Sequence, residues 1–397
     1  MRAAARSRTK VSTRMGRVAY RPVRRITFPL YVGGFLGPFG GAMLVAIIPN
    51  VARGLDASVT QVAAAITAYM VPFAVLQLFS GTLAERLGPR RVVRAGYIGF
   101  GAAALGCALA PEIWSFLAAR AVMGASNAFL SPILLAALSE VVAPAVLGRT
   151  VGTFAAAQTA GLTFAPILGG LLGEISWRLA FVLVAVVSVV LALPHQTLGA
   201  AERATTSAPR ASFRTLLNRW IALLATQAML GYLGFTAIGF VLVLVAADEF
   251  ALGSSARGLL VAGYGIGGIL LGRYAGSVVD RIGRPPAALA GAVACTAGVV
   301  GLVFAPTVWG LALVYFAIGC ASTFVWAGLN TIAVESFPEN RAGATSAYSA
   351  FKFAGVAIAP LLYVPLFHVD TRLPFVLAAA FSALLAVLVL PWFGRYR

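Results

Sequence analysis

Long apolar stretches alternate with short polar segments along almost the whole chain. Most stretches run for about 18–24 residues, close to the length of helix that crosses a bilayer core. We count twelve of them: 28–49, 62–82, 92–110, 113–139, 150–172, 178–195, 219–246, 256–277, 286–305, 308–333, 343–366 and 373–393. Prolines stand at many of the ends, as expected where a helix must stop. The pattern predicts an all-α membrane protein with twelve transmembrane helices.

Composition supports lipid as the solvent of this chain. Hydrophobic residues make up 60% of its 397 residues, charged residues make up 11%, and the mean hydropathy is +0.92. A soluble domain carries about 25% charged residues. A soluble chain this apolar would lack the polar groups needed to cover its surface. We therefore expect a lipid bilayer around most of the protein.

Basic residues are unevenly shared between the two sides that such helices define. With the N-terminus placed inside, the inner segments hold 23 of the 30 Lys and Arg residues, and the outer segments hold four. Cytoplasmic loops carry this kind of excess. Both termini are predicted to be cytoplasmic, and the plasma (inner) membrane is the expected location. The basic tail 1–25 is expected near anionic lipid rather than nucleic acid, because Tyr20 is its only aromatic residue.

A short motif occurs twice, each time where one apolar stretch ends and the next begins. The first copy is Gly81-Thr-Leu-Ala-Glu85-Arg86-Leu-Gly88, and the second is Gly276-Ser-Val-Val-Asp280-Arg281-Ile-Gly283. The acid, the arginine and the second glycine all recur at one offset of 195 residues (280 minus 85). Arg178-Leu-Ala-Phe-Val-Leu and Arg372-Leu-Pro-Phe-Val-Leu repeat at nearly the same offset. The repeats predict two similar halves with a cavity between them.

The predicted division of the chain follows from these repeats. We expect a basic cytoplasmic tail (1–25), an N-terminal six-helix bundle (26–195), a cytoplasmic linker (196–218) and a C-terminal six-helix bundle (219–397). The linker is polar, alanine-rich and basic, which is typical of a connecting segment. Six plus six helices in parallel arrangement place a pseudo-two-fold axis along the membrane normal.

At these residues the chain resembles the major facilitator superfamily, over nearly everything from Phe28 to Phe393. The segment Gly161-x-x-x-Ala165-Pro166-x-x-Gly169-Gly170 is similar to the helix-five motif of twelve-helix drug/proton antiporters in that superfamily. Arg120-Ala-Val-Met-Gly124 is similar to their helix-four element. Glu85 replaces the usual aspartate, Pro89 stands where an arginine is usual, and Ala165 replaces a glycine. The resemblance implies the major facilitator fold of two pseudo-symmetric six-helix bundles.

The resemblance also implies that the duplicated loops latch the halves together when the outside is open. Glu85 would meet the start of the eleventh helix and Asp280 the start of the fifth, where an acid faces the positive end of a helix. Arg90 would pair with Glu140, and Arg284 with Glu335. The candidate gating residues are Gly81, Glu85, Arg86, Gly88, Arg90, Glu140, Gly276, Asp280, Arg281, Gly283, Arg284 and Glu335. The alternative is that these loops are only turn and topology signals.

The helix-five motif is expected to act through backbone packing. Its small residues form a smooth face that lets another helix approach closely. Pro166 interrupts the hydrogen-bond ladder and bends the helix. The eighth predicted helix offers a matching stripe of glycines at Gly268, Gly272 and Gly276. Ordinary membrane packing and a role specific to antiport both fit the motif Gly161, Pro166, Gly169 and Gly170.

Charged and polar residues inside the predicted spans are the candidates for substrate binding or coupling. A charge inside the bilayer is costly and usually functional. Arg120 lies about a third of the way into the fourth span and Lys352 near the middle of the eleventh, whereas Arg273 is close enough to the cytoplasmic end to snorkel. The neutral candidates are Gln77, Asn127, Gln158, Gln227, Tyr232, Trp326 and Asn330. Any one of them can instead form a helix-to-helix hydrogen bond.

None of the twelve acidic residues lies in the middle of a span. This weakens an interpretation as an exporter of cations and favours neutral or anionic substrates. We expect proton-driven efflux of small neutral or amphipathic molecules by alternating access. The alternatives are import or exchange of a small anionic metabolite, and a membrane sensor or scaffold without transport.

Other classes of function are not supported by the sequence. The chain has no Ser/His/Asp constellation, only two histidines and three cysteines without metal-ligand spacing. We expect no enzyme activity, no cofactor, no metal and no nucleic-acid partner. The expected partners are a small-molecule substrate, protons and the lipid bilayer, and the chain is expected to act as a monomer.

Overall fold

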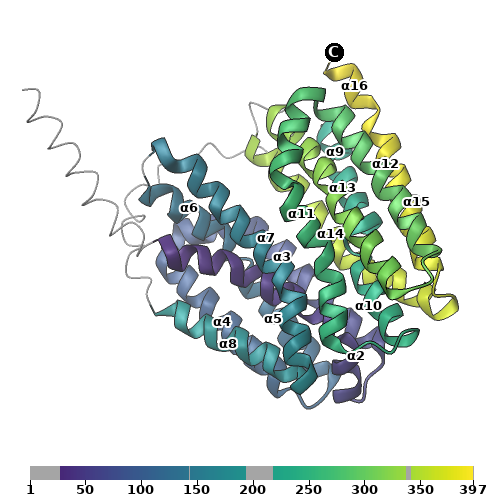
Figure 1. The fold of residues 1–397 in the computed structure, drawn as a ribbon. Helices are drawn as coiled ribbons and strands as arrows, with labels where there is room; N and C mark the ends of the chain where they lie inside the picture. Colours follow the sequence, from purple (N-terminus) through teal and green to yellow (C-terminus); the bar gives the residue numbers. More distant parts are fainter. Residues whose placement is uncertain (1–26, 143, 194–217, 337–340, 397) are drawn as a thin grey trace, which may run out of the picture.

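The computed structural model describes residues 27–142, 144–193, 218–336 and 341–396, where every secondary-structure element is helical and none is a strand (Figure 1). Ten of the described helices are long and apolar enough to cross a membrane, and the bent pair Thr27–Ala42 and Leu44–Gly54 makes an eleventh. The remaining predicted span corresponds to Trp177–Ala192, a shorter apolar helix of 16 residues. The all-α membrane fold is confirmed, and its helices are consistent with twelve spans.

The first half of the chain contains two interruptions within predicted spans. In chain order its helices are Thr27–Ala42, α2 (Leu44–Gly54), α3 (Val59–Leu87), α4 (Pro89–Leu109), α5 (Ile113–Asn127), α6 (Ser131–Val141), α7 (Pro144–Ile175) and α8 (Trp177–Ala192). The first predicted span bends by 46° at Met43. The fourth is broken between α5 and α6.

The second half contains one unusual helical turn. Its elements are α9 (Arg219–Gly231), η3 (Tyr232–Thr236), α10 (Gly239–Asp248), α11 (Ser254–Ile282), α12 (Arg284–Val303), α13 (Val308–Glu335), α14 (Arg341–Val369), α15 (Leu373–Val389) and α16 (Pro391–Arg395). The seventh predicted span is therefore α9 and α10 joined by the π-helical turn η3. Such turns appear frequently at functional sites.

Both copies of the duplicated motif have a glycine at the same position, Gly88 and Gly283, because the turn there requires a positive φ. Gly88 has φ 87° and Gly283 has φ 95°, in the left-handed region that side chains disfavour. Each glycine ends one long helix and begins the next, and its N–H donates to the carbonyl of Ala84 or Val279. Proline follows in the first turn of the next helix in both copies. The repeat thus encodes the same helix–turn–helix in each half.

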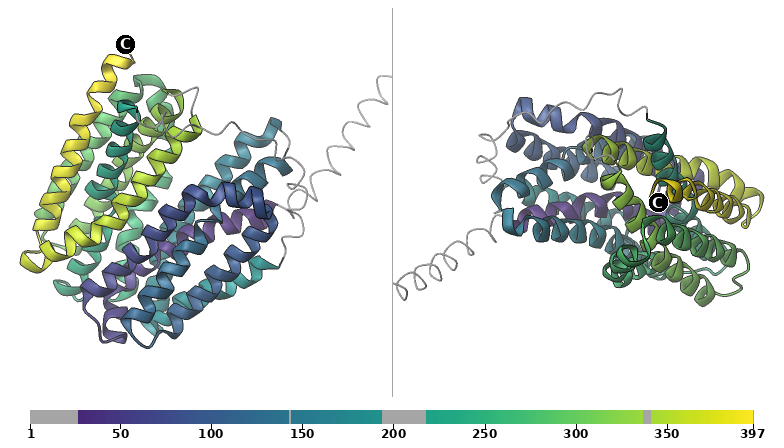
Figure 2. Two further views of the ribbon diagram at one scale, coloured as in Figure 1. Left: turned by 180° about the vertical axis from the view of Figure 1, so that it is seen from behind. Right: turned by 90° about the horizontal axis from the view of Figure 1, so that it is seen from above.

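The two halves form two groups of helices that are joined near α2 and α10 and splay toward α6 and α16 (Figures 1 and 2). We call the end that holds the Gly88 and Gly283 turns the motif end, and the opposite end, with the start of α11, the distal end. Within the halves, α4 packs on α8 and α12 on α13. Between the halves, α11 packs on α7 and α14 on α3.

Large apolar side chains are exposed along the outer faces of the helices. Trp114, Leu270 and Trp309 are among them, with exposed fractions of 66%, 64% and 84%. Soluble monomers rarely expose apolar surface this extensively. These faces fit contact with lipid, as the composition predicts.

Candidate functional site

The distal end of the interface between the halves is closed by contacts at the start of α11. Ser254 Oγ donates to the carbonyl of Gly170 on α7 (2.7 Å), and the N–H of Ser255 donates to Glu174 Oε1 (2.9 Å). A carboxylate at a helix N-terminus is stabilised by the positive end of that helix. Glu174 of one half therefore caps a helix of the other half.

Asn50, on α2, connects three helices at the same end. Its amide nitrogen donates to the carbonyl of Gly173 on α7 (3.1 Å), and its amide oxygen accepts a hydrogen bond from Arg257 on α11. Arg257 is only 2% exposed. Because the Asn50 amide uses both its donor and its acceptor here, separation of the halves would break this link between α2 and α11.

The second pair of helices, α3 and α14, is closed from the distal end to about the middle. Thr67 Oγ1 donates to the carbonyl of Ala357 (2.6 Å). Farther toward the motif end, the rings of Phe73 and Phe353 meet edge to face, with 4.9 Å between centroids. Phe73 and Phe353 belong to opposite halves, so this aromatic pair lies directly on the interface.

The helix-five motif packs on two sides of α7. A Cβ added to Gly161 would overlap the carbonyl of Phe35, and one added to Gly169 would lie 2.6 Å from the carbonyl of Met43. This face of the motif therefore receives the helix Thr27–Ala42 and its bend. Real Cβ atoms do not approach other atoms so closely, so glycine is required for this packing.

The other side of the same motif faces α11 across the interface. A Cβ on Gly170 would overlap the carbonyl of Ser254, and a Cβ on Gly258 would overlap the carbonyl of Pro166. Main chains of the two halves thus touch directly. The motif contributes to the closed distal end as well as to packing within its own half.

The motif end of the same helix pair is open. A Cβ on Gly272 or Gly276 of α11, or on Gly152 of α7, would meet nothing within 4 Å. The predicted match between the helix-five motif and the stripe Gly268, Gly272 and Gly276 does not occur in this conformation, because α7 meets α11 nearer the distal end. The interface therefore closes at one end and leaves open space at the other.

Arg120 contacts the bent first helix. Its side chain is completely buried, and its guanidinium donates to the carbonyls of Gly40 (3.0 Å) and Gly41 (3.2 Å), just before the bend at Met43. The same group lies 4.4 Å from the ring centroid of Tyr69. In this conformation backbone carbonyls and an aromatic ring enclose the charge of Arg120, and its predicted role in the cavity or in coupling stays a prediction.

Asn127 and Gln227 are also buried among other helices. Asn127 Nδ2 donates to Tyr69 Oη (2.8 Å). Gln227 Nε2 donates to the carbonyl of Leu388 (2.6 Å), and its Oε1 accepts a hydrogen bond from Trp392 Nε1 (3.1 Å). Both side chains form hydrogen bonds between helices of one half, so the structure does not support their predicted place in the cavity lining.

Lys352 lies on α14 in a different environment. Its Nζ is 5.3 Å from the ring centroid of Tyr232, 5.8 Å from that of Trp326 and 5.6 Å from that of Tyr348. Among the residues whose side chains are described, no carboxylate forms an ion pair with it. The three predicted candidates Lys352, Tyr232 and Trp326 are therefore brought together, and Tyr348 joins them.

A hydrogen-bonded layer fixes the indole of Trp326. Its Nε1 donates to Tyr264 Oη (3.3 Å), which also bonds Thr236 Oγ1 (3.0 Å) at the end of η3. The ring of Tyr264 stacks on Tyr315 at 5.4 Å, and Tyr315 Oη donates to the carbonyl of Thr236 (3.3 Å). The aromatic surroundings of Lys352 are thus held in place by the π-helical turn.

The remaining polar candidates have no side-chain hydrogen bond to any residue that the structure describes. Gln77 on α3 and Gln158 on α7 are half-buried, and Asn330 on α13 is exposed. All three lie in the part of their helices that runs toward the motif end, where the interface is open. They stay candidate lining residues.

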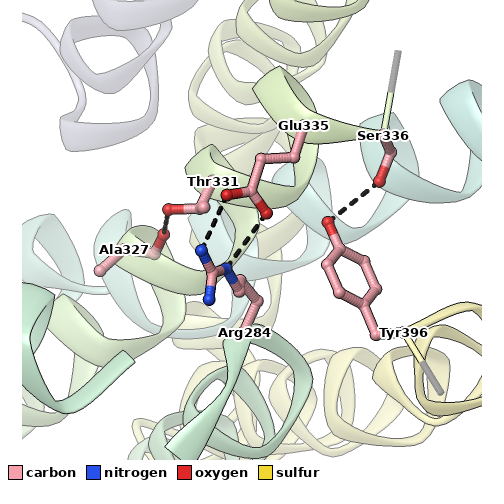
Figure 3. Close-up of polar contacts among 6 residues, drawn as sticks. All are labelled: Arg284, Ala327, Thr331, Glu335, Ser336 and Tyr396. Atoms are coloured by element: carbon pink, nitrogen blue, oxygen red, sulfur yellow. Dashed lines mark hydrogen bonds and ion pairs between the residues drawn. The ribbon is translucent and has the colours of Figure 1, made fainter. Parts of the chain in front are cut away.

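The predicted ion pair of Arg284 with Glu335 is present at the motif end (Figure 3). Arg284 Nη2 lies 2.8 Å from Glu335 Oε1, and Arg284 Nε donates to Oε2 (3.1 Å). Nearby, Ser336 Oγ and Tyr396 Oη are 3.2 Å apart (Figure 3). Both members of the ion pair are partly exposed and belong to one half, so the pair does not itself join the halves.

The other gating candidates make no contact between the halves that the structure describes. Asp280, Arg86 and Arg281 are exposed, and Arg90 is half-buried. The side chains of Glu85 and Glu140 lie outside the described residues, so the predicted contacts of both are untested. An open motif end is the conformation in which the predicted latch would be released.

Several residues of this arrangement were not predicted from the sequence. Asn50 and Arg257 meet across the interface without any local pattern that pairs them. Tyr348 could have been found, because it precedes Lys352 by four residues and therefore lies on the same helix face. Tyr264 and Thr236 give no such signal, since only the folded arrangement places them behind Trp326.

Comparison with known proteins finds one matching family. The model of the Major Facilitator Superfamily matches residues 30–231 and again 224–397. A puromycin resistance protein of Streptomyces alboniger is 34% identical over 140 residues, which are 35% of this chain and 28% of that protein. The multidrug efflux pump LfrA of Mycolicibacterium smegmatis is 31% identical over 159 residues, 40% of this chain and 31% of the pump. The matched part of the chain thus spans less than a third of these curated relatives.

A solved structure shares the whole architecture. The nucleoside transporter NupG superposes with a TM-score of 0.76, covering 92% of this chain and 99% of that one at 16% sequence identity. Identity this low supports the fold alone.

Proposed function

Because this chain belongs to the Major Facilitator Superfamily of membrane transporters, we propose that it exports small neutral or amphipathic molecules in exchange for protons, by alternating access. The observation that carries this proposal is the asymmetric interface: contacts between the halves close the distal end, and the same helices stand apart at the motif end. A central site in such a protein is reached from one side at a time.

We infer that the motif end faces the cytoplasm, because the segments predicted on that side hold the excess of basic residues. On this inference the structure is the conformation that would be open to the cytoplasm, in which an exporter takes up its substrate. Lys352 precedes Phe353, so its aromatic surroundings lie where the interface changes from closed to open. A substrate bound there would lie beside the contact that must break during transport.

The opposite conformation requires the distal contacts to part and the motif end to close. Gly272 and Gly276 leave room for α7 to approach α11. Asp280 and Glu85 would then reach the starts of α7 and α14, as the family resemblance implies. This gives the duplicated loops a role as a cytoplasmic latch.

Glu174 is the candidate that links protons to this change. Its carboxylate caps α11 across the closed distal end. Protonation would remove the negative charge that the helix N-terminus stabilises. A proton arriving from the distal side would therefore weaken the closed distal end and favour opening there, so Glu174 would gate the change without itself carrying the exchanged proton across the membrane.

Efflux is favoured over uptake by the names of the relatives, among them a puromycin resistance protein and a multidrug efflux pump. Import or exchange of a small anionic metabolite is the second candidate, and Lys352 without a carboxylate partner favours it. The two differ in which compounds move protons and in which direction.

The test uses purified protein in liposomes that contain a pH-sensitive dye. Neutral drugs and sugars, cationic drugs and small organic anions are added singly across a proton gradient. The proposal expects proton release with neutral or amphipathic compounds, and reduced release in Glu174→Gln but not in Glu249→Gln, a matched change of an exposed acid at the same end. Proton flux with small polar anions alone would support the second candidate, and silence across the panel would contradict proton coupling.

A further inference from the structure

Lys352 is a cation whose surroundings are incomplete without an anion. Three aromatic rings lie within 5.3–5.8 Å of its Nζ, and no carboxylate of the described side chains pairs with it. Attraction to ring faces is weaker than an ion pair with a hydrogen-bonded acid. Lys352 is half-buried, and a charge withdrawn from water normally has a full partner. The missing partner is best supplied by a ligand.

Tyr348 offers a second group for the same ligand. Its hydroxyl is buried and has no hydrogen-bond partner among the residues that the structure describes. Tyr348 precedes Lys352 by one helical turn, so both side chains lie on one face of α14. A carboxylate oxygen that accepts from both groups would satisfy the ammonium and the orphaned hydroxyl together.

The aromatic side chains beside Lys352 determine which non-anionic part of the ligand fits. The ring centroids of Tyr232 and Trp326 lie 5.1 Å apart, and the indole is fixed through its hydrogen bond to Tyr264. Aromatic faces pack best against flat, apolar groups. The ammonium of Lys352 repels a cation, and none of the described carboxylates lies beside it to offset that repulsion.

We propose that Lys352 and Tyr348 form an anion-binding subsite and that the transported substrate is an organic anion with a flat, apolar body. This rests on the proposed function and narrows its substrate class from neutral or amphipathic molecules to amphipathic carboxylates. Tyr232 and Trp326 contact the apolar body, and the Phe73–Phe353 contact next to Lys352 relays occupancy to the interface between the halves.

The experiment compares two probes of the same shape, 2-naphthoate and its neutral amide 2-naphthamide. Their binding to the purified full-length protein in detergent is measured by isothermal titration calorimetry, without any proton gradient. We expect the carboxylate to bind at least tenfold more tightly than the amide. Lys352→Met should abolish this preference, Lys352→Arg should keep most of it, and Tyr348→Phe should weaken carboxylate binding several-fold.

Two matched variants control for indirect effects. Tyr274→Phe removes a hydroxyl from an exposed tyrosine on α11, and Arg91→Met removes an exposed positive charge from α4. Both should bind the probes as the unmodified protein does. Equal binding of carboxylate and amide, a preference that survives Lys352→Met, or binding of neither probe would overturn the inference.

The liposome assay separates this inference from the proposed function. Proton release by neutral compounds, together with no Lys352-dependent preference for naphthoate, would leave efflux standing and refute the anion subsite. A Lys352-dependent preference for naphthoate without proton movement by any compound would support the anion subsite and refute proton-coupled efflux.

Discussion

Replacement of Arg120 by glutamine tests whether this buried charge is structural. The guanidinium makes two hydrogen bonds of 3.0 and 3.2 Å to the carbonyls before the bend at Met43, and stacks on Tyr69. A hydrogen bond to a charged group contributes about 1.5–3 kcal/mol, and loss of a partner leaves buried acceptors unpaired. Glutamine is shorter and can replace one bond at most. We therefore expect Arg120→Gln to lower the free energy of unfolding by about 2–4 kcal/mol.

Thermal unfolding measured with a thiol-reactive dye suits this prediction. Cys107 and Cys295 are fully buried and become reactive only when their helices separate. For a bundle of this size, a loss of 1 kcal/mol lowers Tm by about 2–4 °C, so the variant should melt roughly 5–15 °C earlier. Arg91→Gln, an exposed charge on α4, should melt like the unmodified protein.

The opposite result would restore a functional role for Arg120. Unchanged melting of Arg120→Gln, combined with a shifted pH profile of proton release in liposomes, would show that the charge acts in coupling and that its contacts to the first helix contribute little. A structural brace predicts lower stability and an unchanged pH profile for the protein that remains folded.

Three other substitutions probe the turns, the interface and the ion pair. Gly283→Ala forces a side chain into φ 95° and should cost about 1–2 kcal/mol in a melting assay, whereas Gly394→Ala, with open space around it, should cost little. Gly258→Ala places a Cβ against the carbonyl of Pro166, so a membrane-impermeant reagent should reach the distal end more readily than in Gly152→Ala, where the space is open. Arg284→Gln breaks a partly exposed ion pair, so the free energy of unfolding should fall by less than about 1 kcal/mol. A larger loss of unfolding free energy would show that the pair holds the motif end together.

The features that sequence predicts well have local causes. Apolar stretches long enough to span a bilayer become helices because only a helix satisfies all backbone hydrogen bonds within one segment in lipid. The glycines at positions 88 and 283 follow from a left-handed turn that both halves repeat. The family resemblance implied the pair Arg284 and Glu335 at two neighbouring helix ends, and the structure contains it.

The features that sequence misses depend on contacts between distant segments. A charge within a span marks Arg120 and Lys352 equally, yet one is enclosed by carbonyls of the first helix and the other by aromatic rings of its own half. Apart from Tyr348, which precedes Lys352 by one helical turn, neither surrounding is encoded near the residue itself. The bend at Met43 and the turn η3 were likewise not predicted, although Pro38 and Pro49 flank the bend and Gly231 and Gly234 lie at the turn.

The most direct test of alternating access is a reversible lock on the closed distal end. Thr67 and Ala357 belong to opposite halves, and Thr67 Oγ1 donates to the Ala357 carbonyl. Both are replaced by cysteine in a chain whose native Cys107, Cys295 and Cys320 are changed to serine or alanine, and mass spectrometry confirms the disulfide after oxidation. The account predicts that oxidation stops substrate-driven proton release in liposomes and that reduction restores it. Undiminished release while the disulfide is intact would show that the distal contacts need not open, and would contradict the account.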